Sequence, residues 1–152
     1  MVSTVLFFIF LFTLILSWFV IRRGKGVITF IYGWGFPMGA FVWEDLCIFS
    51  IYGLIASVVT AITHQNRIGL LLFIIFWIVR SAGEAGYFFL QQFIQPKHHP
   101  HYIDDHFDLM RKIFGKISYQ QCLIIMQVVF QIVLMLALFS LIMLLLNWNV
   151  IG

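Results

Sequence analysis

Charged residues are scarce in this chain, and their scarcity excludes a water-soluble fold. Only 10% of the 152 residues are Asp, Glu, Lys or Arg, whereas 62% are hydrophobic. Soluble domains carry about 25% charged residues, so a soluble protein of this size could not hide so much apolar surface from water. The net charge of +3 is too small and too scattered to indicate a nucleic-acid partner.

The motifs of the common enzyme classes are also missing. There is no G-x-S-x-G nucleophile elbow, no H-E-x-x-H zinc motif and no phosphate-binding glycine loop. The five histidines form no H-x-x-H-H box of the kind found in membrane di-iron enzymes, and none lies inside an apolar run, where a haem-bearing bundle would place it. The two cysteines, Cys47 and Cys122, lie far apart in the sequence, and we expect reduced thiols.

Long apolar runs are what the chain does have. A membrane-spanning helix needs roughly 20 mostly apolar residues, because the hydrocarbon core of a bilayer is about 30 Å thick. Four segments meet this requirement, at about 2–21, 43–63, 68–93 and 122–146. The first lacks the basic start of a signal peptide, so we expect it to be retained as a span. The sequence predicts an all-α integral membrane protein, a four-span transmembrane helix bundle forming one domain over residues 1–152.

Basic residues concentrate in the first and third loops between these spans. The second loop has Arg67 alone. In a four-span protein the first and third loops share one side of the membrane, and the positive-inside rule makes that side cytoplasmic. We therefore expect both termini on the non-cytoplasmic side. The basic residues of the first and third loops are Arg22, Arg23, Lys25, Lys97, Arg111, Lys112 and Lys116.

Two segments outside the spans have a pattern of their own. Residues 27–42 are apolar and aromatic but rich in glycine, with Pro37, which breaks a helix. We expect an interfacial lead into the second span, or otherwise a re-entrant hairpin; a fifth span would separate the two basic loops. Residues 103–117 carry apolar side chains every three or four positions, acids at the start and bases at the end. This pattern predicts a short amphipathic helix on the cytoplasmic membrane surface.

The third span contains two opposite charges one helical turn apart, Arg80 and Glu84. Ionisable residues at membrane depth usually mark a polar pathway, a binding site or a tight helix contact. With the predicted topology, polar residues of the second, third and fourth spans share the cytoplasmic half of the bundle. The predicted polar intramembrane cluster consists of Glu44, Asp45, Arg80, Glu84, Tyr87, Gln91, Gln127 and Gln131.

This cluster has two possible interpretations. The first is a polar cavity or pathway, in which Arg80 attracts an anion or Glu84 handles a cation or proton. The second is helix packing, in which the charges pair within one helix and the glutamines hold neighbouring helices together. Three small residues beside the charges, Ala82, Gly83 and Gly86, would let another helix approach closely, either within the chain or between subunits.

A histidine-rich stretch of the third loop is the candidate for a metal site. It contains His98, His99, His101 and His106 close to three aspartates. Histidine and carboxylate suit zinc or iron, but the spacing matches no known ligand motif. A solvated loop is therefore the better interpretation, and we favour no cofactor.

The leading hypothesis is a non-enzymatic membrane protein embedded in the lipid bilayer. It would be a small homo-oligomeric channel or transporter-like protein, or a subunit of a larger membrane complex, because the chain is too small to enclose much of a pathway alone. The alternative is a membrane-embedded enzyme acting on a lipid or quinone, with the histidines and aspartates of the third loop holding a metal ion.

Overall fold

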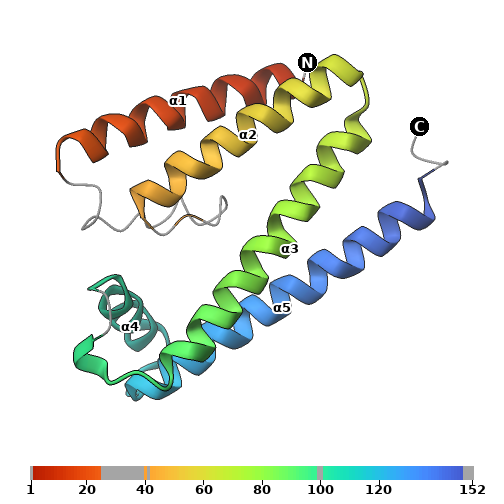
Figure 1. Cartoon of the computed structure of the whole chain (residues 1–152). Coiled ribbons are helices and arrows are strands. Elements are labelled where there is room, and N and C mark those ends of the chain that lie inside the picture. The colour runs from red at the N-terminus through yellow and green to blue at the C-terminus, as the bar shows by residue number, and fades with distance from the viewer. Residues whose placement is uncertain (1, 25–39, 41, 99–100, 149–152) are drawn as a thin grey trace. The chain divides into compact units, whose positions relative to one another are not determined.

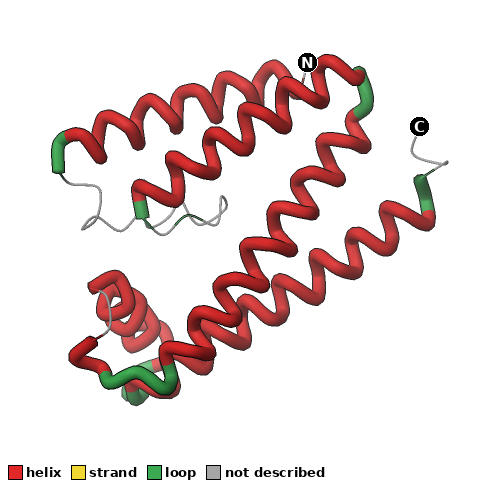
Figure 2. Tube along the Cα trace, in the orientation of Figure 1, coloured by secondary structure: helices red, strands yellow, loops and turns green. Residues whose placement is uncertain are grey.

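The protein is all-helical over the part of the chain that its computed structural model describes (Figures 1 and 2). That part is residues 2–24, 40, 42–98 and 101–148, without the side chains of residues 2, 96, 101–106 and 109. The elements are α1 (Val2–Arg22), α2 (Trp43–Thr63), α3 (Asn66–Gln91), the short 3₁₀ helix η2 (Pro96–His98), α4 (His101–Phe114) and α5 (Tyr119–Leu146).

Four of these helices, α1, α2, α3 and α5, are long and apolar enough to cross a membrane. The four-span helix bundle predicted from the sequence is thereby confirmed. Apart from Ala40 and Val42, the segment 27–42, for which we predicted an interfacial or re-entrant course, lies outside the described residues.

The turn between α4 and α5 ends α4 before the predicted residue 117 and starts α5 before the predicted residue 122. Helix α4 ends at Phe114, because Gly115 adopts a positive φ of 78° and donates its backbone N–H to the Arg111 carbonyl at 2.9 Å. Helix α5 then starts at Tyr119 behind a capping box. Ser118 Oγ accepts the Gln121 N–H at 3.2 Å, and Gln121 Oε1 accepts the Ser118 N–H at 2.7 Å.

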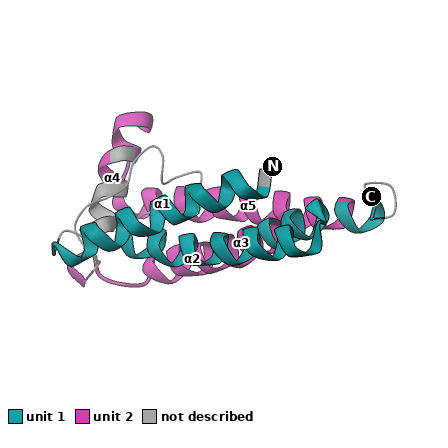
Figure 3. Cartoon of the chain, turned by 90° about the horizontal axis from the view of Figure 1, so that it is seen from above, with its two compact units in different colours: residues 1–73, 144–152 teal, residues 74–143 magenta. Residues whose placement is uncertain are grey.

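The chain divides into two compact units (Figure 3). The first comprises residues 1–73 and 144–152, which include α1, α2, the start of α3 and the end of α5. The second comprises residues 74–143, which include the rest of α3, α4 and most of α5. Each unit is described below by itself.

Small residues join α1 to α2 in the first unit. Thr13 Oγ1 and Ser50 Oγ lie 2.7 Å apart, and both side chains are buried. Gly53 lies one turn further along α2, and a Cβ added there would overlap the ring of Phe10. Small and hydroxyl-bearing residues let helix backbones approach closely in membranes, so this stripe explains why the two helices lie side by side (Figure 1).

Two further hydrogen bonds hold the start of α3 and the end of α5 in the first unit. The Tyr52 hydroxyl donates to the Leu72 carbonyl at 2.7 Å. The Arg67 guanidinium donates to the Trp148 carbonyl, just beyond the end of α5, and lies 5.8 Å from the centre of the Trp148 ring. A cation at a helix C-terminus satisfies a carbonyl that has no partner within the helix.

In the second unit, α3 and α5 run antiparallel and side by side (Figure 1). The rings of Phe88 and Phe130 stack with centroids 5.9 Å apart, and Gln92 Nε2 donates to Gln127 Oε1 at 2.6 Å. Ser81 lies seven residues before Phe88, and Ala137 lies seven residues after Phe130; both are also buried. The buried positions therefore recur with the seven-residue period of a coiled-coil seam.

Candidate functional site

Arg80 and Glu84 form an ion pair near the middle of α3. The Arg80 Nη1 and Glu84 Oε1 atoms lie 2.5 Å apart, and the two side chains are only 16% and 13% exposed. Pairing cancels the net charge within one helical turn, which lowers the cost of placing both groups at membrane depth. Arginine before glutamate is the weaker order for such a pair, so the sequence order does not maximise helix stability.

The other two residues of the predicted α3 stripe, Tyr87 and Gln91, follow on the same side of the helix. Gln91 is buried, and Tyr87 is half-buried with its ring packed edge-on against Phe88, 5.5 Å between centroids. The four residues Arg80, Glu84, Tyr87 and Gln91 thus form a continuous, largely covered stripe. That this stripe lines a pathway stays a prediction.

A neighbouring stripe, shifted by one residue, is the one whose members meet α5. It consists of Ser81, Ala85 and Phe88, which are buried, followed by Gln92, which bonds to Gln127. We predicted Gln127 as a cluster member but missed its partner Gln92. The intervals from Ser81 to Gln92 are the same as those from Arg80 to Gln91, so helical spacing alone does not distinguish the two stripes.

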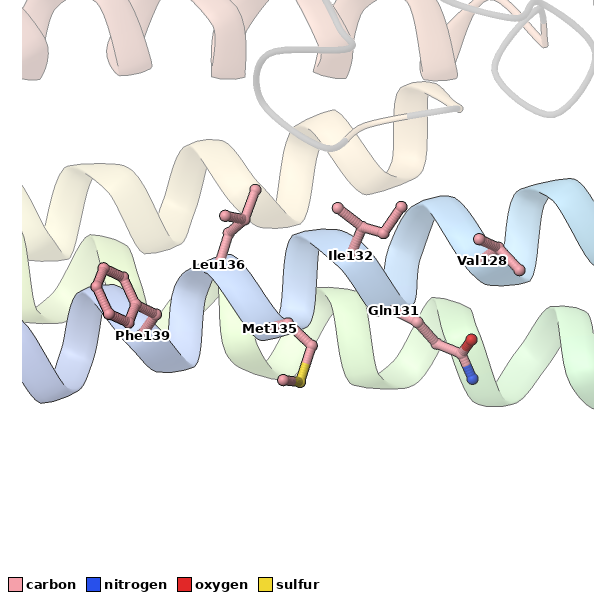
Figure 4. Close-up of a pocket in the computed structure, with 6 residues that line it drawn as sticks. All are labelled: Val128, Gln131, Ile132, Met135, Leu136 and Phe139. Atoms are coloured by element: carbon pink, nitrogen blue, oxygen red, sulfur yellow. The ribbon is translucent and has the colours of Figure 1, made fainter.

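Gln131 differs from Gln127, although both come from the same predicted glutamine stripe. Its side chain is exposed on α5 and makes no hydrogen bond to any residue that the structure describes. It is the polar member of a set that lines an open hollow along α5 (Figure 4). The lining residues are Val128, Gln131, Ile132, Met135, Leu136 and Phe139.

The two acids of the predicted cluster on α2 lie in the other unit. Glu44 and Asp45 occupy the first turn of α2 and are half-buried. Carboxylates in that position interact favourably with the positive end of the helix dipole. The helix dipole thus explains why acidic residues occupy the first turn of α2. That they form one cluster with Arg80 and Glu84 stays a prediction.

The small residues of α3 face open space within the chain. Ala82, Gly83 and Gly86 are exposed, and a Cβ added at either glycine would meet no atom within 4 Å. The α5-facing seam uses Ser81 and Ala85 instead. No helix among the described residues packs closely against Ala82, Gly83 and Gly86. That a neighbouring helix does so stays a prediction.

The histidine-rich stretch is described only in part. His98 is exposed at the end of η2, whereas His99 and the side chains of His101 and His106 lie outside the described residues. Among the side chains that are described, no three His, Cys, Asp or Glu residues lie close enough together to hold a metal ion. Cys47 and Cys122 are free thiols, as expected.

Helix α4 has the amphipathic character expected of a surface helix. Its side chain Phe107 packs against Tyr119 at the start of α5, with ring centroids 5.1 Å apart, and the Arg111 guanidinium lies 5.4 Å from the Phe107 ring. The following residues, Lys112 and Ile113, are exposed. Basic and apolar residues next to the end of a span suit the boundary between lipid headgroups and acyl chains.

The fold and these sites define a class: a multi-pass integral membrane protein with four helical spans, in contact with the lipid bilayer. Comparison with protein-family models, with curated proteins and with solved structures gives no match to the chain. Its function must therefore be argued from its own residues.

Proposed function

We propose that this chain is a non-enzymatic membrane protein, either a small homo-oligomeric channel or transporter-like protein or a subunit of a larger membrane complex. The observation that carries the proposal is the Arg80–Glu84 ion pair, which is largely covered and lies near the middle of a span. Such groups are expensive at membrane depth and are retained where they handle an ion or hold an assembly.

The uncovered surface of the second unit supports an oligomer. Ala82, Gly83 and Gly86 lie on the turns of α3 that carry the ion pair, yet they face open space. Small residues at this spacing suit a closely packed helix neighbour. A neighbour placed there would exclude lipid from the surroundings of Arg80 and Glu84 and could complete a polar pathway that one copy leaves open.

The proposed orientation places the basic ends of α1 and α4 in the cytoplasm and both termini outside. Arg22 and Arg23 lie over the rings of Trp18 and Phe19, at 5.0 and 3.9 Å from the ring centres. Basic and aromatic side chains at the end of a span anchor it at the interface, and basic residues favour the cytoplasmic side.

Flux measurement in proteoliposomes tests the proposal. Vesicles with trapped pH-sensitive and halide-sensitive dyes report movement of protons and chloride through the wild-type protein. Arg80→Ala and Glu84→Ala should abolish flux or assembly, whereas the double exchange Arg80→Glu with Glu84→Arg should keep assembly and alter ion preference. Lys97→Ala removes an exposed cation outside the spans and is the matched control.

Two outcomes separate the forms of the proposal. If Arg80→Ala and Glu84→Ala both leave expression, assembly and flux unchanged, the ion pair has no functional role and the proposal fails. If the wild-type oligomer carries no flux but co-purifies from its native membrane with foreign subunits, the protein is a component of a larger complex.

A further inference from the structure

The side chain of Gln131 lies at membrane depth without a hydrogen-bond partner among the described residues. It lies near the middle of the 28-residue helix α5, exposed and without a hydrogen bond to any described residue. The middle of a spanning helix sits in hydrocarbon, where no water can bond to an amide. A primary amide that loses its bonds to water and gains none in return is costly to bury.

The residues around Gln131 form a second regular stripe on α5. From Ile124 onward, exposed side chains recur at alternating intervals of four and three residues, which is the heptad spacing of a helix interface. These residues lie on a different face from Leu123, Met126 and Phe130, which are buried. The Gln131 stripe consists of Ile124, Val128, Gln131, Met135, Leu138 and Ile142.

We infer that the Gln131 stripe of α5 packs against the same stripe of a second copy of this chain, with the two Gln131 amides hydrogen-bonded to each other. The inference rests on the proposed homo-oligomeric function and names its interface. Polar side chains that bond across helices hold membrane helices together, and a single buried amide in a heptad seam fixes register and the number of strands.

A second copy is the partner that fits this face best. All copies insert with the same orientation, so α5 helices related by a twofold axis along the membrane normal are parallel. Gln131 of one copy then meets Gln131 of the other at the same depth, as an isologous contact requires. An amide both donates and accepts, so two identical side chains satisfy each other, whereas a foreign span would need its own polar group at that depth.

Cysteine cross-linking in the membrane tests the geometry. In a background with Cys47→Ser and Cys122→Ala, Met135→Cys on the stripe should form a disulfide between copies under mild oxidation. Leu136→Cys is the matched control, because the two native side chains are 67% and 61% exposed but leave α5 on different sides (Figure 4). Cross-linking at Leu136→Cys in place of Met135→Cys would overturn the inference.

Dilution in lipid tests the amide itself. Copies labelled with donor or acceptor dyes report association by energy transfer as lipid is added. Gln131→Leu should lower the association constant by about three- to thirtyfold, the effect of one interhelical hydrogen bond in a membrane. Gln131→Asn, which keeps an amide, should lower it less. Equal association of the wild type and Gln131→Leu would contradict the inference.

These outcomes are independent of the flux test. A homo-oligomer that does not respond to changes at Gln131 or Met135 removes this interface and leaves the Arg80–Glu84 proposal standing. Conversely, stripe-specific cross-linking with no flux change in Arg80→Ala and Glu84→Ala removes the role of the ion pair and leaves the interface. A foreign subunit captured at Met135→Cys would also overturn the pairing of two copies.

Discussion

The contact between α1 and α2 and the contact between α3 and α5 are built from different polar groups. Between α1 and α2 the buried polar side chains are hydroxyls, and Thr13, Ser17, Ser50 and Ser57 each lie within 3.0 Å of a carbonyl of their own helix. Between α3 and α5 the polar contact is an amide pair, Gln92–Gln127, beside the stacked rings of Phe88 and Phe130.

The two contacts differ in where their polar side chains find hydrogen-bond partners. A hydroxyl that bonds within its own helix needs no partner elsewhere, so α1 and α2 can bury these four hydroxyls without a polar partner on another helix. In the second unit, amide and charged side chains bond to other side chains: Gln92 bonds to Gln127 across the two helices, and Arg80 pairs with Glu84 along α3. The proposed function rests on the Arg80–Glu84 pair, and the proposed interface rests on Gln131, which is exposed.

The largest expected effect comes from breaking the ion pair of the second unit. Arg80→Ala or Glu84→Ala leaves one charge without its partner in a mostly covered site, which costs about 3–5 kcal/mol of unfolding free energy for a buried pair. The exchange Arg80→Glu with Glu84→Arg should lose far less. Detergent titration from mild micelles into sodium dodecyl sulfate, followed by circular dichroism, measures both; equal losses would show that the pairing itself is unimportant.

Filling the α1–α2 contact should have the next largest effect. Gly53→Ala places a methyl group against the Phe10 ring and should destabilise the fold by about 1–3 kcal/mol, as overpacking does. Gly83→Ala is the matched control on α3, where the added methyl meets open space and should stabilise the monomer by up to about 1 kcal/mol. The same detergent titration compares them, and equal effects would contradict the close approach of α1 and α2.

Removing the amide pair of the second unit should cost somewhat less. Gln92→Leu leaves the Gln127 amide without its partner, and we expect a loss of about 1–2 kcal/mol. The double variant with Gln127→Leu should lose less than the sum of the two single variants, because no amide is then left unmatched. Strict additivity in this double-mutant cycle would show that the two side chains do not interact.

The smallest effect should come from the hydroxyl pair of the first unit. Thr13→Val removes the contact with Ser50, and we expect a loss of about 0.6 kcal/mol, the mean for hydrogen bonds between helices in a membrane protein. Ser57→Ala is the control, since its hydroxyl donates to the Gly53 carbonyl of its own helix at 2.8 Å. A loss larger than that of Gln92→Leu would reverse the contrast between the two contacts.

The spans could be predicted because length and hydropathy decide them. Helix ends were predicted less well, because hydropathy does not show the caps that decide them: Gly115 stops α4 and Ser118 starts α5. The S-x-x-Q pattern at Ser118 is readable as a capping box, and reading it would have corrected the start of α5. The predicted interfacial or re-entrant course of residues 27–42 is not tested by the described part of the chain.

The candidate site could be predicted as a set of residues but not as a set of contacts. Helical spacing shows that Arg80, Glu84, Tyr87 and Gln91 share a face, yet it does not show which face of α3 meets α5. That choice depends on the fit of small and aromatic side chains against the partner helix, which placed the seam one residue further along, at Gln92. For the same reason the sequence could not distinguish Gln127, which is bonded, from Gln131, which is exposed.

Native mass spectrometry of the protein released from lipid shows whether polar groups of the second unit assemble the protein into an oligomer. The comparison needs three samples: the wild type, Thr13→Val in the first unit and Gln131→Leu in the second. We predict mainly homo-oligomer for the wild type and for Thr13→Val, and a larger share of single chains for Gln131→Leu. Single chains in all three samples, or the same oligomer in all three, would contradict the claim.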